Sequence, residues 1–235
     1  MNFRKCVQKL AAHLFCSEPL QDGVRISPGK DVAVSSGNLD AARKYVNAVM
    51  RRLRRDILVQ GVVTADLQSS VDDHSAWELV SGKIWGLERI SHDGMPWPLK
   101  SPSGDGDVDD VGSPERFDVA AVVLLHDICF EATYNYKSAT QMASGQVSGK
   151  IAIVRLDMII GHPQGPGGAP EAHVFEVTEY TRVGIPKKSV GVLNEKIISE
   201  ATEKFVHTCI EDAMSYRVLP VLNNLLKAIP YPDFT

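Results

Sequence analysis

Apolar and polar positions in the last forty or so residues repeat with the period of an α-helix over an unusually long stretch, from about Leu193 to Ile229. At roughly 100° per residue, one face collects apolar or small side chains: Ile197, Ile198, Ala201, Phe205, Thr208, Cys209, Tyr216 and Leu219. Pro220 interrupts this pattern, and the apolar residues beyond it lie on a rotated face. Because a proline inside a helix removes a hydrogen bond, the pattern predicts one long helix kinked at Pro220.

This predicted helix has an apolar stripe that is not stable in water alone, so we expect a concave partner to wrap it. Asp212 falls at the centre of the stripe, and a buried carboxylate needs a partner. Two interpretations follow. Either the helix is rotated there or an arginine pairs with Asp212, or the carboxylate contacts the polar end of a ligand.

A second helical pattern runs from about Leu39 to Val59, with Asn38 as its predicted N-cap. Its apolar positions fall within one arc: Leu39, Ala42, Val46, Val49, Met50, Leu53 and Ile57. Basic side chains occupy the other side: Arg43, Lys44, Arg51, Arg52, Arg54 and Arg55. A core helix with a solvated charged back fits this pattern. So does a helix whose Arg51, Arg52, Arg54 and Arg55 are attracted to an anionic membrane surface.

Between the helices the period changes to that of β-strands, which we predict at 76–90, 117–137, 146–160 and 171–183. In the second strand the even positions from Val122 to Tyr136 stay mostly apolar, whereas the odd positions turn polar after Leu125. The even face is therefore the predicted inner face. The element order predicts an α+β fold, in which a curved antiparallel sheet wraps around the long kinked C-terminal helix and an N-terminal amphipathic helix completes the core.

The composition is that of an ordinary globular protein: 235 residues, 44% apolar and 23% charged. The net charge of −4 argues against a protein that binds nucleic acid with its whole surface, although it leaves local basic patches open, and we predict no nucleic-acid partner. We interpret residues 1–36 as a poorly defined arm, the remnant of a secretion signal whose apolar run is interrupted by Lys9 and His13. Residues 37–235 are predicted to form a single domain with an acidic insert near 97–115.

No pattern typical of catalysis or metal binding is present in the sequence. Asp105, Asp107 and Asp109 alternate as in a calcium loop, but Asp110 and Arg116 stand where an EF-hand needs glycine and glutamate. The seven histidines lack the paired spacing of metal ligands, and no nucleophile motif appears. The sequence therefore predicts a protein that is not an enzyme and that uses no metal or cofactor.

Four cysteines leave the redox state open. Cys6 and Cys16 are close enough in sequence to bridge. Cys129 lies on the odd strand face and Cys209 on the inner helix face, so a bridge between them needs a bulge or a reversed face assignment.

The succession KIWGLERI (83–90) and FDVAAVVLLHDICFEATYNYK (117–137) resembles the group 7 mite allergens. The likeness continues through GKIAIVRLDMIIG (149–161), residues 173–183 and the closing helix, and covers about residues 38–230 apart from the acidic insert. These arthropod proteins are single-domain members of the tubular lipid-binding superfamily, related to the bactericidal/permeability-increasing proteins. The resemblance implies a curved sheet around a long helix, an apolar groove for lipid-like ligands, and an extracellular protein that is allergen-like or innate-immunity-like.

The predicted function is non-enzymatic binding or transport of a lipid or other hydrophobic small molecule. We expect the groove to be lined by the first helix, the second strand and the last helix: Val46, Val49, Met50, Leu53, Leu124, Ile128, Phe130, Ile198 and Phe205. An empty apolar void of roughly 500 Å³ would cost on the order of 12 kcal/mol, so the groove should hold a guest or collapse onto the helices. The alternative is a protein-interaction scaffold with a filled core.

Overall fold

The computed structural model describes residues 35–60, 64–67, 70–71, 77–100, 116–137, 142–163, 168–185 and 195–234. For the residues described within 64–79, for 143 and for 195–201 it describes the backbone alone. The chain divides into two compact units, Met1–Ser35 and Ser36–Thr235, and the described residues belong to the second unit apart from Ser35. The predicted arm, the Asp105–Asp109 series and a Cys6–Cys16 bridge lie outside the described residues, so they stay predictions.

The first helix, α2 (Ser36–Val59), buries the predicted apolar arc apart from Leu39, which is half-buried. Ala42, Val46, Val49, Leu53 and Ile57 expose no surface, which is the result of their three- and four-residue spacing on one helix face. The helix packs against β4 (Ile90–Lys100) and α4 (Leu219–Leu226). It begins two residues before the predicted N-cap, so Asn38 lies inside its first turn instead.

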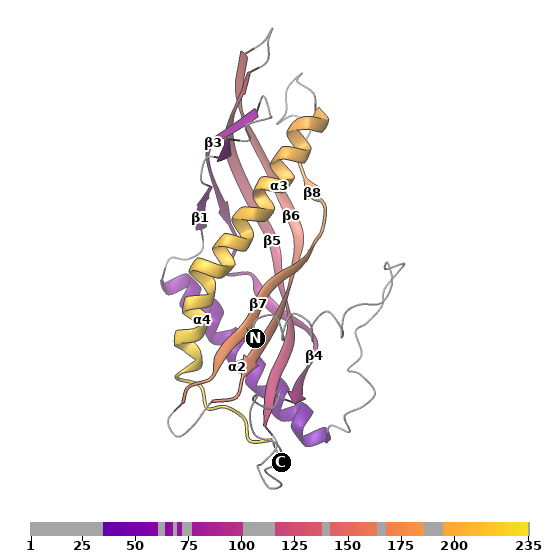
Figure 1. Ribbon diagram of the computed structural model, residues 1–235, viewed down its shortest axis with the longest axis vertical. Helices are drawn as coiled ribbons and strands as arrows, with labels where there is room; N and C mark the ends of the chain where they lie inside the picture. The colour runs from indigo at the N-terminus through magenta and orange to yellow at the C-terminus, as the bar shows by residue number, and fades with distance from the viewer. Residues whose placement is uncertain are drawn as a thin grey trace, which may run out of the picture. The chain divides into compact units, whose positions relative to one another are not determined.

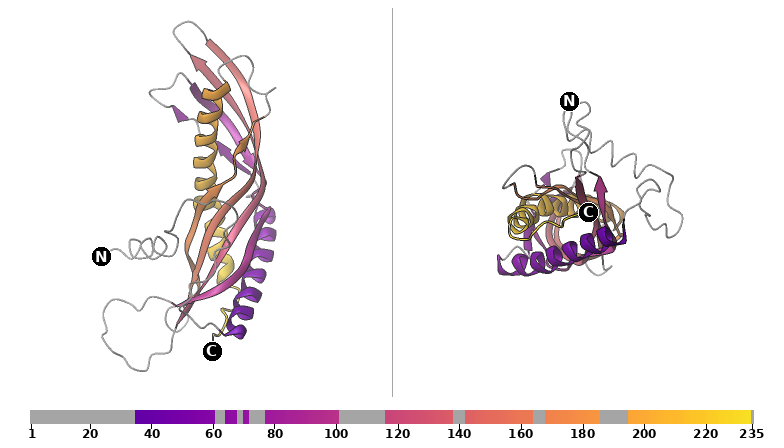
Figure 2. Two further views of the ribbon diagram at one scale, coloured as in Figure 1. Left: turned by 90° about the vertical axis from the view of Figure 1, so that its right-hand side faces the viewer. Right: turned by 90° about the horizontal axis from the view of Figure 1, so that it is seen from below.

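Eight antiparallel strands form one curved sheet (Figures 1 and 2). Five strands follow one another across it: β1 (Thr64–Leu67), β3 (Trp77–Trp85), β5 (Phe117–Lys137), β6 (Met142–Gly161) and β7 (Glu171–Tyr180). The other three pair at its flanks: β2 (Ser70–Val71) with β3, β4 with β5, and β8 (Val183–Gly184) with β6. A curved antiparallel sheet combined with helices confirms the predicted α+β class.

The predicted strand 76–90 is divided by a turn at Gly86. This residue has φ of +102°, a conformation that L side chains rarely adopt, and β3 ends just before it. The chain then returns as β4, which was not predicted because Gly94, Pro96 and Pro98 resemble loop residues. The register of β4 against β5 shifts between Asp93 and Trp97, which accommodates these residues. Residues 97–100 of the predicted acidic insert therefore belong to a strand.

The predicted inner face of β5 is correct only beyond Asp127. Before this residue the odd positions Val119, Ala121, Val123 and Leu125 belong to the hydrophobic core, and after it the even positions do. Asp127 has φ of +55°, and this left-handed residue shifts the side-chain alternation by one position. The partner strand changes in step, with its core positions odd up to Ile151 and even from Val154.

Three consecutive segments form the C-terminal helical run: α3 (Glu195–Ala213), the π-helical turn η2 (Met214–Val218) and α4. Pro220 lies in the first turn of α4, where its missing N–H is tolerated. Immediately before it, the N–H of Leu219 donates to the carbonyl of Met214, which is the wider spacing of a π-turn. The regular helix predicted for Leu193–Ile229 is therefore interrupted, and its bend stays a prediction.

The buried stripe of α3 is rotated from the predicted one by roughly one residue, about 100°. Val206, Ile210 and Ala213 are buried, whereas Thr208 is exposed and Tyr216 is 77% exposed. Asp212 is exposed as well. Of the interpretations given for Asp212, the rotated helix is therefore correct: its carboxylate is solvated and is not part of the core.

Candidate functional site

The helix α3 crosses the sheet from one edge to the other on its concave side (Figures 1 and 2). It contacts β1 and β3 at one edge and β7 at the other. Because β5 and β6 lie between these strands in the sheet, α3 spans both of them. We call α3 the roof, and the parts of β5 and β6 that it spans the floor. We call α3 with the strand segments 77–85, 128–136 and 143–151 the α3 region. The α2 region comprises α2, β4, α4 and the strand segment 117–125.

Two glycines of β6 lie in the floor of the α3 region, each opposite an aromatic residue of β5. Gly149 is paired with Phe130, and Gly145 is paired with Tyr134. A Cβ added to Gly149 would lie 2.5 Å from Cζ of the Phe130 ring and 2.6 Å from the carbonyl oxygen of Gly184. A Cβ on Gly145 would lie 2.7 Å from the hydroxyl of Tyr134. Both rings therefore lie across a glycine on the partner strand, in the manner of aromatic side chains that cover strand glycines.

The roof of the α3 region is apolar with one exception. Phe205, Val206 and Ile210 of α3 are buried in the hydrophobic core. Thr202 lies one helical turn before Phe205 and Val206 and is 0% exposed. Its hydroxyl Oγ1 makes no hydrogen bond to any described residue. This unsatisfied group is unusual, because buried polar atoms are almost always paired.

A polar contact holds α3 against β7. The rings of Tyr180 and His207 are stacked with centroids 3.7 Å apart and planes 10° apart. The Tyr180 hydroxyl donates to Oε1 of Glu211 at 2.9 Å. Burial raises the pKa of Tyr180, and the bond to the Glu211 carboxylate raises it further. Burial lowers the pKa of His207, against the opposing effect of Glu203 and Glu211.

Seven of the nine predicted groove residues belong to one hydrophobic core: Val46, Val49, Met50, Leu53, Ile128, Phe130 and Phe205. Leu124 does not, because its neighbours Val123 and Leu125 face the core and adjacent strand positions point to opposite faces. Leu124 precedes the switch at Asp127, so the even-face prediction failed there. The side chain of Ile198 lies outside the described part of the structure.

Two features of the α3 region were not predicted. Gly145 and Gly149 stand four positions apart in a strand, so they share one face, and that spacing is visible in the sequence. An apolar pattern does not reveal this spacing, because glycine has no apolar side chain to add to it. The unpaired hydroxyl of Thr202 has no sequence signal, since it depends on what packs around the helix.

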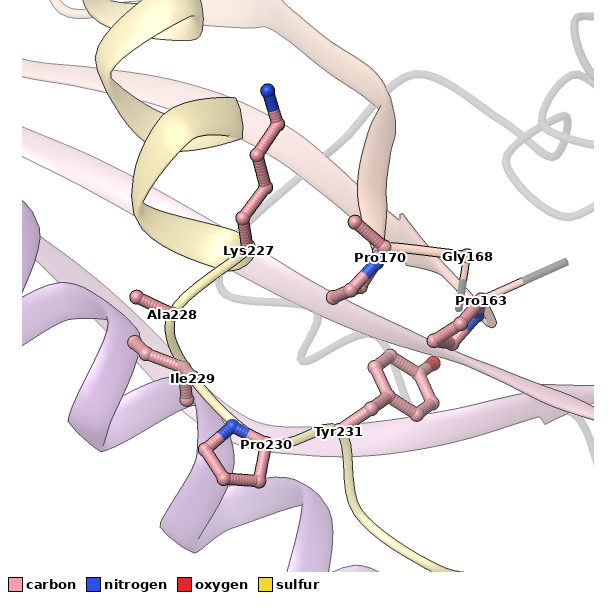
Figure 3. Close-up of a pocket in the computed structure, with 9 residues that line it drawn as sticks. Pro163, Gly168, Pro170, Lys227, Ala228, Ile229, Pro230 and Tyr231 are labelled. Atoms are coloured by element: carbon pink, nitrogen blue, oxygen red, sulfur yellow. The ribbon is translucent and has the colours of Figure 1, made fainter. Parts of the chain in front are cut away.

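A pocket lies at the other end of the unit, beside the α2 region (Figure 1). This pocket has a volume of about 380 Å³ and is lined by Pro163, Gly168, Ala169, Pro170 and the segment from Lys227 to Tyr231. The ring of Tyr231 lies beside Pro163, and the side chain of Lys227 extends away from both (Figure 3). The Tyr231 hydroxyl is shared between the carbonyls of Phe117 at 2.9 Å and Ile160 at 3.1 Å.

An edge-to-face contact joins Tyr231 to Tyr45 of α2, with centroids 5.3 Å apart. The hydroxyl of Tyr45 is buried and bonds to no described residue. Burial alone raises the pKa of Tyr45. This end of the core is therefore closed by two tyrosines: Tyr231 after α4, whose hydroxyl is paired, and Tyr45 on α2, whose hydroxyl has no described partner.

The basic side of α2 is exposed to solvent at Arg51, Arg52, Arg54 and Arg55. Three of the four have internal contacts: Arg52 donates to the Ala228 carbonyl, Arg54 to the Ile90 carbonyl, and Arg55 pairs with Asp56. Arg43 and Lys44 both pair with Asp40. The side that faces away from the core is thus strongly cationic.

Cys129 and Cys209 are free thiols in the structure, so the bridge considered between them is absent. Cys129 is directed away from the core face that its neighbours Ile128 and Phe130 occupy, whereas Cys209 packs against the core. Within the described ranges, no three His, Cys, Asp or Glu side chains are placed to hold a metal ion. None of the described helices combines the length and apolar character needed to cross a membrane.

The fold and site define an α+β protein with a helix closing a curved antiparallel sheet. No family model matches the sequence, and no curated protein matches it either. Among solved structures, the chain is similar to a lipopolysaccharide binding protein, with 16% sequence identity and a TM-score of 0.33. The match covers 81% of this chain and 41% of that chain, so this protein spans well under half the length of its structural neighbour.

Proposed function

We propose that the protein binds a lipid-like or other hydrophobic small molecule between α3 and the concave face of the sheet. The observation that carries this proposal is the placement of α3, which contacts both edges of the sheet above a floor of glycine-backed rings. Because α3 is not a strand of the sheet, it can move away from β5 and β6 without breaking the hydrogen bonds between the strands. An extended apolar guest in that space would replace the contacts that Phe205 and Val206 make with the core.

Further properties complete the proposal. The resemblance of residues 83–90 and 117–137 to group 7 mite allergens supports an extracellular carrier that is allergen-like or innate-immunity-like. The activity that we propose is binding without catalysis.

Native mass spectrometry of the purified protein and titration with a pyrene-labelled alkane test this function. We expect a co-purified apolar molecule or saturable probe binding. Phe205→Asp should abolish binding because it places a charge in the roof, whereas Phe205→Leu should retain it. Leu222→Ala is the matched control, because Leu222 is fully buried in α4, outside the α3 region. Unchanged probe affinity in a folded Phe205→Asp variant would remove α3 from the site.

A scaffold with a filled core is the second candidate function. It is favoured by the full burial of Val46, Val49 and Leu53, whose side chains expose no surface to solvent. In that case the wild-type protein would carry no apolar molecule and bind no probe. The exposed basic side of α2 would then be its most distinctive surface.

We also propose that the basic side of α2 contacts anionic membrane surfaces. Each arginine near such a surface contributes about 1 kcal/mol. Flotation with vesicles of phosphatidylserine and phosphatidylcholine should show binding that weakens in salt, and vesicles of phosphatidylcholine alone should show none. Replacing Arg51 and Arg52 by glutamine should weaken it, because the described contact of Arg52 is to a backbone carbonyl and leaves its charge unneutralised. Lys44→Gln should have less effect because Lys44 is already paired with Asp40. Binding equal to wild type in the double variant would refute the membrane contact.

A further inference from the structure

Thr202 on α3 and Tyr45 on α2 each bury a hydroxyl that bonds to no described residue. Apart from tyrosines, the described buried residues with polar side chains are Asn38, Asp118 and Thr202. Asp118 accepts the N–H of His162 at 3.0 Å, and Asn38 also has an interaction. Only the hydroxyl of Thr202, among these three described residues, has no hydrogen-bond partner.

The same helix shows what a threonine ordinarily does in this position. Thr208 is exposed, and its hydroxyl donates to the carbonyl of Lys204, four residues earlier, at 3.2 Å. Thr202 makes no such bond, although it is buried and has more to gain from one. Its hydroxyl is therefore available to a group that approaches from the core side.

The surroundings of Thr202 limit the chemistry of that group. Phe205 and Val206 continue its helix face into the apolar core. No lysine, arginine or histidine is among the described buried residues, so no cation stands ready to neutralise a carboxylate there. Burying an unpaired carboxylate is far more costly than burying a hydroxyl. A threonine hydroxyl can donate and accept, so it suits an alcohol, an ester or a ketone.

We infer that Thr202 is the hydrogen-bonding point for the ligand, which is a long apolar molecule carrying one uncharged oxygen group. This inference rests on the proposed function. It narrows the ligand class from hydrophobic molecules in general to neutral lipids such as fatty alcohols or esters. Thr202 then acts as a specificity-determining residue, because it distinguishes molecules of equal apolar length by their polar end.

Hexadecanol, hexadecane and hexadecanoate at neutral pH test this inference by displacement of the pyrene-labelled alkane. Thr202→Val replaces the hydroxyl with a methyl group of similar size. We expect it to weaken hexadecanol about tenfold, equivalent to about 1.4 kcal/mol, and to leave hexadecane unchanged. Thr202→Ser keeps the hydroxyl and should bind hexadecanol within about twofold of wild type. Hexadecanoate should bind wild type more weakly than hexadecanol does.

The folding of the variants separates a binding role from a structural one. Because the hydroxyl has no partner among the described residues, the ligand-free Thr202→Val variant should be at least as stable as wild type in urea unfolding. Equal hexadecanol affinity of wild type and Thr202→Val would overturn the inference and leave the proposed function intact. Tighter binding of hexadecanoate than of hexadecanol would overturn it too. Failure of wild type to bind any of the three would instead refute the proposed function, and the inference with it.

Discussion

The two helices that cover the sheet do so in different ways. In the α2 region the helix lies along β4 and against α4, its inward side chains expose almost no surface, and a paired tyrosine closes the end of the core. In the α3 region the helix reaches from edge to edge over glycine-backed rings and carries an unpaired hydroxyl. Each region also buries one hydroxyl without a described partner, Tyr45 on α2 and Thr202 on α3, so the two regions differ in how their helices contact the sheet. The comparison therefore assigns stability to the α2 region and ligand exchange to the α3 region.

Truncating the core of the α2 region gives the largest effect expected from this division. Leu53→Ala should lower the free energy of unfolding by about 2–5 kcal/mol, because Leu53 is fully buried and leaves a cavity. Leu58→Ala in the same helix is the control, since Leu58 is 57% exposed and should change stability by less than about 0.5 kcal/mol. Urea unfolding measures both.

The affinity for the pyrene-labelled alkane shows whether the two regions are separable. Leu53→Ala should bind this probe as wild type does at temperatures where it remains folded. A folded variant with lost affinity would place the ligand beside α2 and contradict the division.

Filling the floor of the α3 region has the next largest effect. Gly149→Ala should cost about 1–3 kcal/mol, because the new methyl group meets both the Phe130 ring and the backbone carbonyl of Gly184. Gly145→Ala should cost less, since its nearest atoms all belong to the Tyr134 side chain, which is able to shift. Thermal unfolding monitored by circular dichroism compares them. Equal costs of the two substitutions would contradict the expectation that the Tyr134 side chain shifts more easily than the Gly184 backbone.

The sequence was sufficient for the elements whose period stays regular. The apolar arc of α2 was predicted correctly because a helix without breaks keeps one phase from Ala42 to Ile57. The curved antiparallel sheet followed from long alternating segments separated by glycine and proline. Periodicity counts side chains along the chain, so it is dependable only while the backbone repeats.

Single-residue backbone changes account for what the sequence could not show. One left-handed residue, Asp127, reversed the face of Leu124, and the buried stripe of α3 was rotated from the predicted phase. Asp127 forms an ion pair with Lys150 on β6 at 2.5 Å. Because this contact joins two different strands, a pattern of local spacing cannot show it. The hydroxyl of Thr202 is a matter of tertiary surroundings, which no local pattern contains.

Paired and unpaired tyrosines at the end of the α2 region give a smaller, matched effect. Tyr231→Phe should lower the free energy of unfolding by about 0.5–1.5 kcal/mol, because two carbonyls lose their donor. Tyr45→Phe should leave stability unchanged or raise it, because its hydroxyl is buried without a described partner. Urea titrations of both variants against wild type decide the order. If Tyr45→Phe lowered the free energy of unfolding more than Tyr231→Phe does, the hydroxyl of Tyr45 would make a stabilising hydrogen bond, contrary to this prediction.

The smallest expected effect is a pH dependence that belongs to the α3 region alone. Burial lowers the pKa of His207 in the folded protein below the value of about 6.5 that it has when unfolded. The unfolded state therefore binds more protons as the pH falls through 6.5, and the folded state loses stability in that window. Glu203 and Glu211 on α3 favour the protonated form and limit the loss, while the ring of Tyr180 on β7 stacks on the imidazole.

Hydrogen exchange between pH 7.5 and 5.5 should show α3 amides losing protection before those of α2, and His207→Gln should remove the difference. Loss of protection in α2 first, or an unchanged profile in His207→Gln, would show that the contact between α3 and β7 is not the pH-sensitive part of the fold.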